Sequence, residues 1–272
     1  MGDEVVKTGR EGAVLVIRLC SPGNRNALTT EVRQQLGEAV EAAESDRQVR
    51  SVFLTGDGPT FCAGGDLSMM QTHADPWPVH RRFRHLSRWL VPLITLDKPV
   101  VVGVRGAAVG GGMGLALTGD VVVAGENAKF IAGFFRLGLV PDIGTMYHLP
   151  RLIGMARAKN FLFGGGTMSA SEALELGLVA KVVPDDAVEA AGLAEAERLA
   201  QGPAEVMGLA KTLMARSFET SLTDMFAFED FGQILAYCSP EFREGLSAMQ
   251  EKRRADFARA AAGQSGGAGA DL

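Results

Sequence analysis

Glycine is concentrated in the stretch VRGAAVGGGMGLALTGD, residues 104–120, where five glycines fall within nine positions. The stretch follows a predicted strand and runs into a predicted helix, although glycine costs a helix about 1 kcal/mol per residue relative to alanine. A bare turn at a helix start exposes N–H groups that lack intrahelical partners and lie at the positive end of the helix dipole. Such groups stabilise a developing oxyanion, each contributing about 3–4 kcal/mol in a transition state. Close packing of a helix on a strand also requires glycine, so this stretch alone leaves both interpretations open.

A second glycine turn lies earlier in the chain. The segment GPTFCAGGDL (58–67) follows the predicted strand SVFLTG (51–56) and places Gly64 and Gly65 before an acidic residue. Two such turns, each after a strand, can supply two converging N–H donors. Neither G-x-G-x-x-G nor G-x-x-x-x-G-K-[ST] occurs in the sequence, so phosphate binding by those loops is poorly supported.

Composition narrows the classes of protein. Of the 272 residues, 47% are hydrophobic and 22% are charged, which is typical of a globular domain. The net charge of −5 disfavours a broad nucleic-acid-binding surface. The three cysteines are far apart and form no C-x-x-C metal motif, which favours a reducing, cytoplasmic setting and predicts no metal site. The N-terminus is charged and lacks the apolar core of a signal peptide, and no run is long enough to span a membrane.

Hydrophobic patterns predict strand–helix alternation to about residue 185, followed by helices only. This order predicts an α/β core with a C-terminal helical region. Ser169 and Glu172 have capping-box spacing, and Thr29 or Thr30 is expected to cap a helix. Strands are expected at 13–19, 51–56, 99–104, 120–125 and 178–183. Helices are expected at 29–44, 76–95, 169–177 and from 187 to about 259, with breaks at Gly202-Pro203 and Ser239-Pro240.

These motifs resemble the crotonase superfamily, also called the enoyl-CoA hydratase/isomerase family. The resemblance extends over nearly the whole chain and is carried by SPGNRNALT (21–29), FCAGGDL (61–67), VVGVRGAAVGGGMGLALTGD (101–120), AKFIAGFFRLGLVPDIGTMYHLPRLIG (128–154), SASEALELGLVAKVVP (169–184) and SPEFREGLSAMQEKRRADF (239–257).

The resemblance implies an architecture and a ligand. It implies a spiral of ββα units over residues 1–200 and a helical trimerisation region over 201–260. The low-complexity segment 261–272 is typical of a disordered tail. The ligand implied is an acyl-CoA thioester, with CoA as part of the substrate and no separate cofactor. The assembly implied is a homotrimer or a dimer of trimers, with neither nucleic acid nor membrane as partner.

The resemblance also implies site residues. The thioester oxygen is expected between the N–H groups of Gly65 and Gly111. The remaining residues expected to bind substrate or CoA are Arg25, Ala63, Asp66, Leu67, Gly114, Phe134 and Lys252. A lysine at the position of Lys252 reaches the 3′-phosphate of CoA in the family, but Met249 stands where an aromatic residue usually stacks on the adenine.

The positions of the two hydratase glutamates are occupied by Gly114 and Phe134. Neither can activate water or deliver a proton, so ordinary hydration is disfavoured. Asp142 matches the acidic residue with which a subset of the family, resembling Δ3,Δ2-enoyl-CoA isomerases, moves a proton between C2 and C4. Pro-Asp before a glycine is also common turn chemistry, so Asp142 has a purely structural alternative.

Two other functions remain open. The chain could be a non-catalytic acyl-CoA-binding protein that kept the oxyanion hole. It could also be a hydratase or thioester hydrolase with non-standard acid–base residues, and hydrolysis would require a partner histidine such as His73.

Overall fold

The computed structural model describes residues 4–67, 70 and 75–262. His73 and most of the segment predicted to be a disordered tail therefore lie outside the described residues. Within the described part of the chain, no helix is both long enough and apolar enough to cross a membrane.

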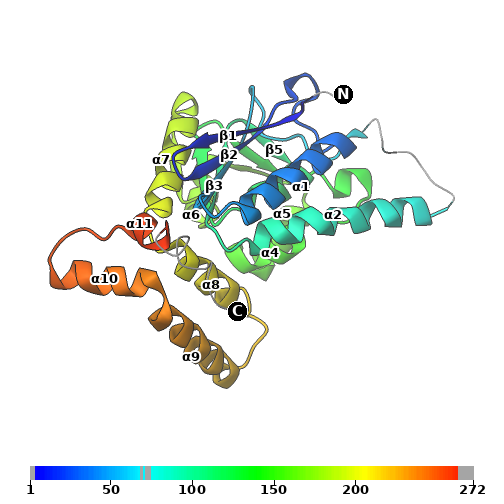
Figure 1. Ribbon diagram of the computed structural model, residues 1–272. Helices are drawn as coiled ribbons and strands as arrows, with labels where there is room; N and C mark the ends of the chain where they lie inside the picture. Colours follow the sequence, from blue (N-terminus) through cyan, green and yellow to red (C-terminus); the bar gives the residue numbers. More distant parts are fainter. Residues whose placement is uncertain (1–3, 68–69, 71–74, 263–272) are drawn as a thin grey trace.

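The main sheet has six strands in the order β1-β2-β3-β4-β6-β9 (Figure 1). The first two strands form an antiparallel hairpin, and all the following pairs are parallel. The residues of β3 and β4 are all buried, as predicted for apolar strands covered on both faces. The strands are β1 (Val6–Glu11), β2 (Val14–Leu19), β3 (Ser51–Gly56), β4 (Val100–Val104), β6 (Val121–Gly125) and β9 (Lys181–Val183).

A second sheet of three short strands was not predicted. It contains β5 (Ala107–Val109), β7 (Lys129–Ile131) and β8 (Thr167–Ser169), in that order. Each strand has three residues, which is too short for a hydrophobic period to be recognised. The second sheet forms because the chain turns sharply after β4 and after β6. Each of these two strands is therefore followed by a short strand, β5 or β7, that belongs to the second sheet.

Helices cover both faces of the main sheet. On one face α7 packs against Phe53 and the strand valines, while α1 and α2 lie over the opposite core. Both predicted caps are confirmed: the Thr29 hydroxyl accepts a hydrogen bond from Val32 N, and Ser169 and Glu172 form a capping box. The helices are α1 (Thr30–Ser45), α2 (Trp77–Thr95), α3 (Gly111–Ala116), α4 (Thr145–Ile153), α5 (Met155–Phe163), α6 (Ala170–Glu175) and α7 (Val188–Ala200).

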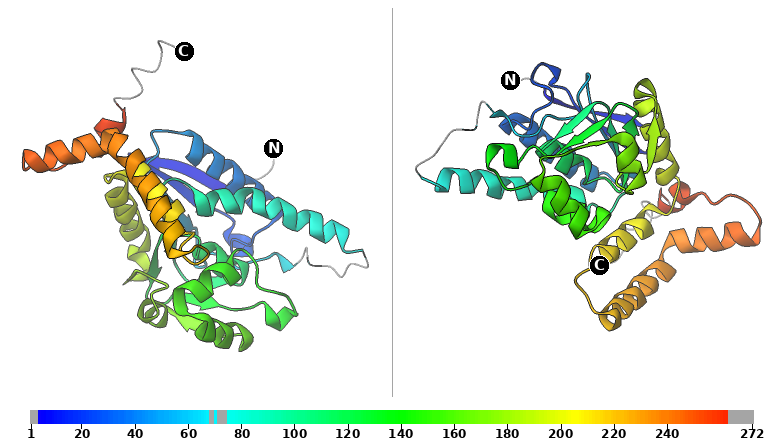
Figure 2. Two further views of the ribbon diagram at one scale, coloured as in Figure 1. Left: turned by 90° about the horizontal axis from the view of Figure 1, so that it is seen from below. Right: turned by 180° about the vertical axis from the view of Figure 1, so that it is seen from behind.

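The C-terminal helices leave the body of the molecule as an arm (Figures 1 and 2). The predicted breaks at Gly202-Pro203 and Ser239-Pro240 are present, with Pro203 at the N-cap of α8 and Pro240 as the first residue of α10. Further breaks follow α8 and α10, where the sequence pattern had indicated continuous helix. The helices are α8 (Ala204–Met214), α9 (Leu222–Cys238), α10 (Pro240–Gln250) and α11 (Phe257–Ala262).

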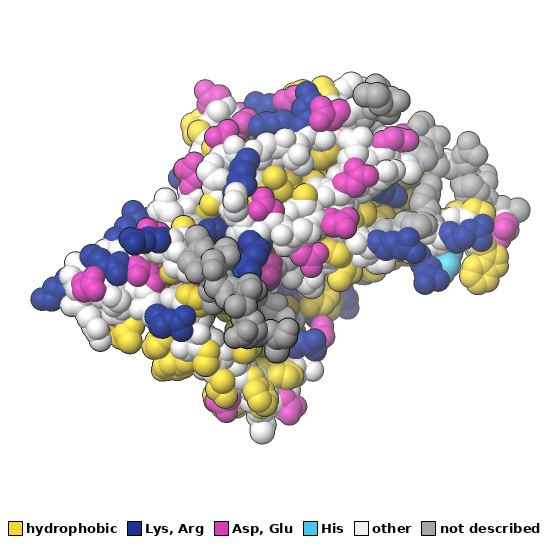
Figure 3. Space-filling model, in the orientation of Figure 1, with side chains coloured by type: hydrophobic (Ala, Val, Ile, Leu, Met, Phe, Trp, Pro, Cys, Tyr) yellow, Lys and Arg dark blue, Asp and Glu magenta, His cyan; other side chains and the backbone are white. Residues whose placement is uncertain are grey.

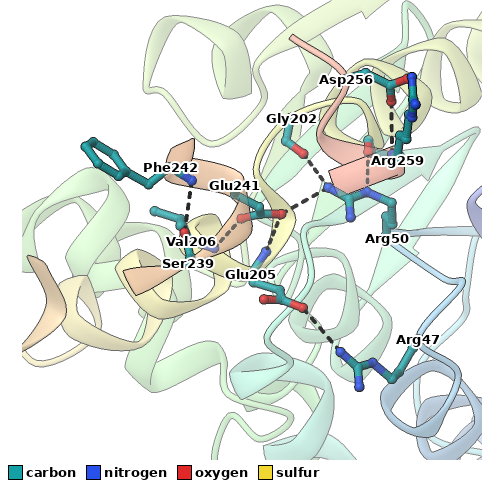
Figure 4. A network of polar contacts seen from close by, with 11 residues as sticks. Arg47, Arg50, Gly202, Glu205, Val206, Ser239, Glu241, Phe242, Asp256 and Arg259 are labelled. Carbon is teal, nitrogen blue, oxygen red and sulfur yellow. Dashed lines mark hydrogen bonds and ion pairs between the residues drawn. The ribbon is translucent and has the colours of Figure 1, made fainter. Parts of the chain in front are cut away.

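A buried ion pair attaches this arm to the core (Figure 4). Arg50, directly before β3, donates to the carbonyls of Ala200 (2.8 Å) and Gly202 (2.7 Å) and lies 3.1 Å from a carboxylate oxygen of Glu241. Glu241 also accepts hydrogen bonds from two backbone N–H groups in the first turn of α8. One side chain pair therefore fixes the end of α7, the start of α8 and the start of α10 together.

We predict that Glu241→Ala lowers the free energy of unfolding by about 3–5 kcal/mol, because it leaves the Arg50 charge buried without its carboxylate. The measurement is chemical denaturation. Glu195→Ala, which breaks the exposed pair with Arg198, is the control and should cost less than about 1 kcal/mol. Equal effects of the two variants would show that the buried pair does not hold the arm.

Candidate functional site

The two glycine turns predicted from the sequence lie against each other. The 58–67 segment pairs with β5: Cys62 N donates to Ala107 O (3.2 Å), and Val109 N donates to Cys62 O (2.9 Å). Cys62 itself is buried, and burial raises the pKa of its thiol to about 12, so the thiol remains protonated. The segment therefore contributes its backbone rather than a nucleophile.

Close packing, one of the two uses of glycine considered from the sequence, is seen at Gly64 and Gly112. A Cβ on Gly64 would collide with Val109 O and lie 3.2 Å from Gly111 N, and Gly64 has φ +84°. A Cβ on Gly112 would lie 2.8 Å from the carbonyl carbon of Cys62. These two glycines are required because the backbones of the two turns touch.

Gly65 and Gly111 lie next to this contact, and both line the same cavity. Gly111 is the first residue of α3, so its N–H has no partner within the helix. Among the described residues, no acceptor is hydrogen-bonded to the N–H of either glycine. The arrangement leaves two neighbouring amides for a carbonyl oxygen.

The cavity in front of the two glycines has a volume of about 590 Å³ and mainly apolar walls. Among the described residues of its wall, the charged ones are Arg33, Asp66 and Asp142. The predicted site residues that meet in this wall are Ala63, Gly65, Asp66, Leu67, Gly111, Phe134 and Asp142. A cavity of this kind, with few polar groups among apolar ones, is typical of a small-ligand site.

Asp142 reaches the cavity next to Gly111. Its Oδ1 lies 3.4 Å from the position that a Cβ would take on Gly111. The same oxygen is buried and has no hydrogen-bond partner within the described structure. Burial raises the pKa of Asp142 above its ordinary value, and the positive charge of Arg33 partly opposes this rise. A carboxylate made more basic by desolvation is suited to accept a proton.

The backbone beyond Asp142 is strained. Ile143 adopts φ +50°, which is unfavourable for a β-branched residue, and its side chain is 3% exposed. The turn itself is formed by the backbone, since Thr145 N donates to Asp142 O (3.0 Å). The turn interpretation of Asp142 and the catalytic one are thus compatible: the peptide forms the turn, and the side chain lines the cavity.

The two positions that lack the hydratase glutamates differ in their surroundings. The Phe134 ring borders the cavity, with its edge 3.8 Å from the position of a Cβ on Gly110. Gly114 is buried beneath the turn, where a Cβ would lie 2.5 Å from Ile143 O and 2.7 Å from Thr145 Oγ1. Gly114 is not among the described residues of the cavity wall.

Arg25 and Lys252 also lie outside the described wall of the cavity. Both are exposed and have positive φ, Arg25 at +58° and Lys252 at +53°. The carbonyl of Arg25 accepts a hydrogen bond from Ala63 N (3.0 Å), so its backbone supports the first glycine turn. Contacts of the two side chains with CoA phosphates remain predictions.

Sequence reasoning did not assign roles to Asn26 and Arg33. Asn26 is fully buried, and its amide donates to Asp57 O and Thr60 O, each at 2.8 Å, thereby fixing the entry into the first glycine turn. The sequence feature that could have pointed to Asn26 is an asparagine among turn-forming residues, because asparagine side chains in turns often hydrogen-bond to the backbone. Arg33 lies on the first turns of α1, and nothing in the helical pattern distinguishes it from a solvent-exposed arginine.

Within the ranges that the structure describes, no group of three or more His, Cys, Asp or Glu residues is arranged to hold a metal ion.

Comparisons with known proteins agree with this geometry. A family model described as "Enoyl-CoA hydratase/isomerase" matches residues 9–260. The 1,2-epoxyphenylacetyl-CoA isomerase of Escherichia coli is 36% identical over 259 residues, which cover 93% of this chain and 98% of that protein. The crystal structure of an enoyl-CoA hydratase from Polaromonas sp. JS666 superposes with a TM-score of 0.88 at 34% identity, covering 92% of this chain and 98% of that one.

A solved enoyl-CoA hydratase/isomerase from Cupriavidus metallidurans CH34 gives a TM-score of 0.89 at 30% identity, over 94% of this chain and 97% of its own. The fold is the crotonase fold. The chain belongs to the enoyl-CoA hydratase/isomerase family, whose members are acyl-CoA-processing enzymes.

We predict that Gly114→Ala destabilises the protein by about 1–3 kcal/mol, because the added methyl group overlaps Ile143 O and overpacks the buried turn. The displaced turn should also weaken the binding of acyl-CoA. Thermal melting and calorimetric titration with a saturated acyl-CoA measure the two effects. Gly9→Ala is the control, since a Cβ there meets nothing within 4 Å; similar losses in both variants would contradict the prediction.

Proposed function

We propose that the protein is a Δ3,Δ2-enoyl-CoA isomerase in which Asp142 carries the proton. The observation that supports this most directly is the buried carboxylate oxygen of Asp142 beside Gly111, together with the lack of an acid at Gly114 and Phe134, the two usual glutamate positions. An isomerase needs one base that also acts as the acid, whereas a hydratase needs two groups and a water molecule.

The proposed reaction uses the site as follows. The thioester oxygen of a 3-enoyl-CoA accepts hydrogen bonds from the N–H groups of Gly65 and Gly111. The Asp142 carboxylate removes a proton from C2, and the electrons of that C–H bond form a dienolate whose negative charge is stabilised by the two amides. Protonated Asp142 then returns the proton to C4, which leaves a C2=C3 double bond and regenerates the carboxylate. The reaction consumes no cofactor, since CoA is part of the substrate.

Hydrolysis of the thioester is less well supported by the cavity. A carboxylate nucleophile in such a reaction works best with a histidine nearby. No histidine is among the described residues of the cavity wall, and His148 lines a separate cavity, where burial lowers its pKa to about 4. His73 lies outside the described part of the chain.

A second candidate is the isomerisation of an epoxide-bearing acyl-CoA. It is favoured by the 36% identity to the 1,2-epoxyphenylacetyl-CoA isomerase of Escherichia coli, which extends over 93% of this chain. Both candidates use a thioester enolate site and one acid–base group. They differ in the acyl group that the cavity accepts.

We predict that Asp142→Asn lowers the conversion of a 3-enoyl-CoA to the conjugated 2-enoyl-CoA by about 10²–10⁴-fold, because it removes the proton carrier. The dissociation constant for a saturated acyl-CoA should remain within a few-fold of that of the native protein. Thermal stability at pH 7 should not fall, because the substitution replaces a buried charge by a neutral side chain of the same shape.

The pH dependence provides a separate test of the same residue. Since burial raises the pKa of Asp142, the active carboxylate form should be lost as the pH falls through that raised value, above 3.8. The native protein should therefore show an acid limb in kcat/KM that the residual activity of Asp142→Asn lacks. Unchanged turnover in the variant would place the base elsewhere. Tight binding without turnover in the native protein, over several acyl chains, would favour a non-catalytic binding protein.

We also propose that the protein forms a homotrimer or a dimer of trimers through the arm. Helix α9 packs mainly against α8 and α10, and it exposes large apolar side chains around much of its circumference (Figure 3). Exposed apolar surface of this size is typical of a protein interface. The residues are Leu222, Phe226, Phe231, Ile234, Leu235 and Tyr237, each more than half exposed.

We predict that Phe231→Glu combined with Ile234→Glu shifts the protein to a monomer of 28.7 kDa, because the interface would then have to bury two charges. Light scattering after size-exclusion chromatography measures the mass. The control is Glu38→Gln on the surface of α1, which should leave the assembly unchanged. A monomeric native protein would contradict the proposal.

A further inference from the structure

Behind the reaction cavity lies a second cavity, and the two share part of their walls. The second cavity, of about 750 Å³, is bounded by α1 and α2, and both Thr30 and Arg33 line it as well as the reaction cavity. Buried apolar residues of this α1–α2 cavity are Val40, Leu86 and Trp89. Arg33 therefore lines both the cavity where a thioester would react and a second cavity, whose wall combines these apolar residues with the polar side chains of Gln34, Glu41, Glu44 and Arg88.

Arg33 is an unusual residue for such a position. It is half-buried and carries the one positive charge among the described residues of the reaction cavity wall. Its charge acts on the site directly, since it opposes the rise in the pKa of Asp142. A guanidinium presents several N–H donors in a fixed plane and accepts no hydrogen bond, so a ligand beside it gains from an oxygen acceptor. A purely hydrocarbon chain would only displace water from it.

We propose that Arg33 selects acyl-CoA substrates whose acyl group carries a neutral oxygen acceptor beyond the thioester, such as a hydroxyl, carbonyl or ether-type oxygen. The oxygen accepts a hydrogen bond from Arg33, and the apolar remainder of the acyl group packs against the apolar part of the reaction cavity wall. This assignment of a substrate class rests on the proposed placement of the thioester oxygen at Gly65 and Gly111.

The charges of the cavity favour a neutral oxygen over a carboxylate. Arg33 is accompanied in the described wall by two carboxylates, Asp66 and Asp142. An acyl group with its own carboxylate would bring a third negative charge into an apolar cavity with one positive charge, which is costly at low dielectric. A hydroxyl or carbonyl oxygen gains the charge-assisted hydrogen bond without that repulsion.

The test is calorimetric binding of saturated acyl-CoA thioesters, which the proposed isomerase cannot convert. The series contains hexanoyl-CoA, its 4-, 5- and 6-hydroxy derivatives, and adipyl-CoA as the anionic member. We expect at least one hydroxy derivative to bind the native protein about tenfold more tightly than hexanoyl-CoA, as for a hydrogen bond to a charged group, and adipyl-CoA to bind no better than hexanoyl-CoA.

Arg33→Met should remove this preference while keeping an unbranched side chain at this position. Arg84→Met is the matched control, since Arg84 is exposed on α2 and lines neither cavity; it should keep the preference. The proposal is wrong if no hydroxy derivative is preferred by the native protein, if the preference survives in Arg33→Met, or if adipyl-CoA is the member preferred.

Failure of the isomerase proposal would give a different result. If the native protein does not convert a 3-enoyl-CoA but still prefers a hydroxy derivative, the proposed isomerase reaction is wrong, and the selection of substrates by Arg33 is still supported. If Arg33→Met shifts the acid limb of the kcat/KM profile and the native protein shows no hydroxyl preference, Arg33 affects only the pKa of Asp142, and its proposed role in substrate selection is wrong.

Discussion

The contact between two backbones at Gly64 and Gly112 is the constraint on which the site depends. The first glycine turn and the start of α3 approach so closely that a Cβ on either residue would overlap the other segment. Two amides can point into one cavity only when their loops meet without intervening side chains. The hydrogen bonds between the 58–67 segment and β5 keep the loops in register, and the parallel strands β3 and β4 bring both loops to the same end of the sheet.

The surroundings of Asp142 are energetically unfavourable. An unpartnered carboxylate oxygen in an apolar cavity and a β-branched residue at positive φ are each unfavourable. Both features lie in one turn, and the buried glycines of α3 leave the space that this turn occupies. Gly114 is required there because the carbonyl of Ile143 lies where a side chain would be. The glycine at position 114 thus makes room for the turn that carries the proposed base.

A buried polar pair helps to attach the arm. Arg50 and Glu241 pair with each other and with backbone groups at the end of α7 and the start of α8. Such a pair contributes little net stability over an apolar alternative. It does fix the first turns of α8 and α10 relative to each other, while the large apolar side chains of α9 remain exposed.

The strands β2, β3, β4, β6 and β9, the caps at Thr29 and Ser169 and the positions of both glycine turns could be inferred from the sequence, because they depend on local periodicity and backbone chemistry, whereas β1, α4 and α5 were not predicted. The short strands β5, β7 and β8 could not be inferred, since three residues are held in a sheet only by partners from distant parts of the chain. Arg33 and Asn26 were missed for the same reason: their burial depends on α2 and on the 57–60 loop.

The sequence by itself therefore determined the family, the fold class and the absence of an acid at positions 114 and 134. Only the tertiary structure decided which glycines serve packing and which expose an amide, and that Asp142 lies beside Gly111 with its pKa raised by burial. The physical reason is that close approach, desolvation and charge at a site are properties of atoms brought together by folding, and no single segment of the chain contains them.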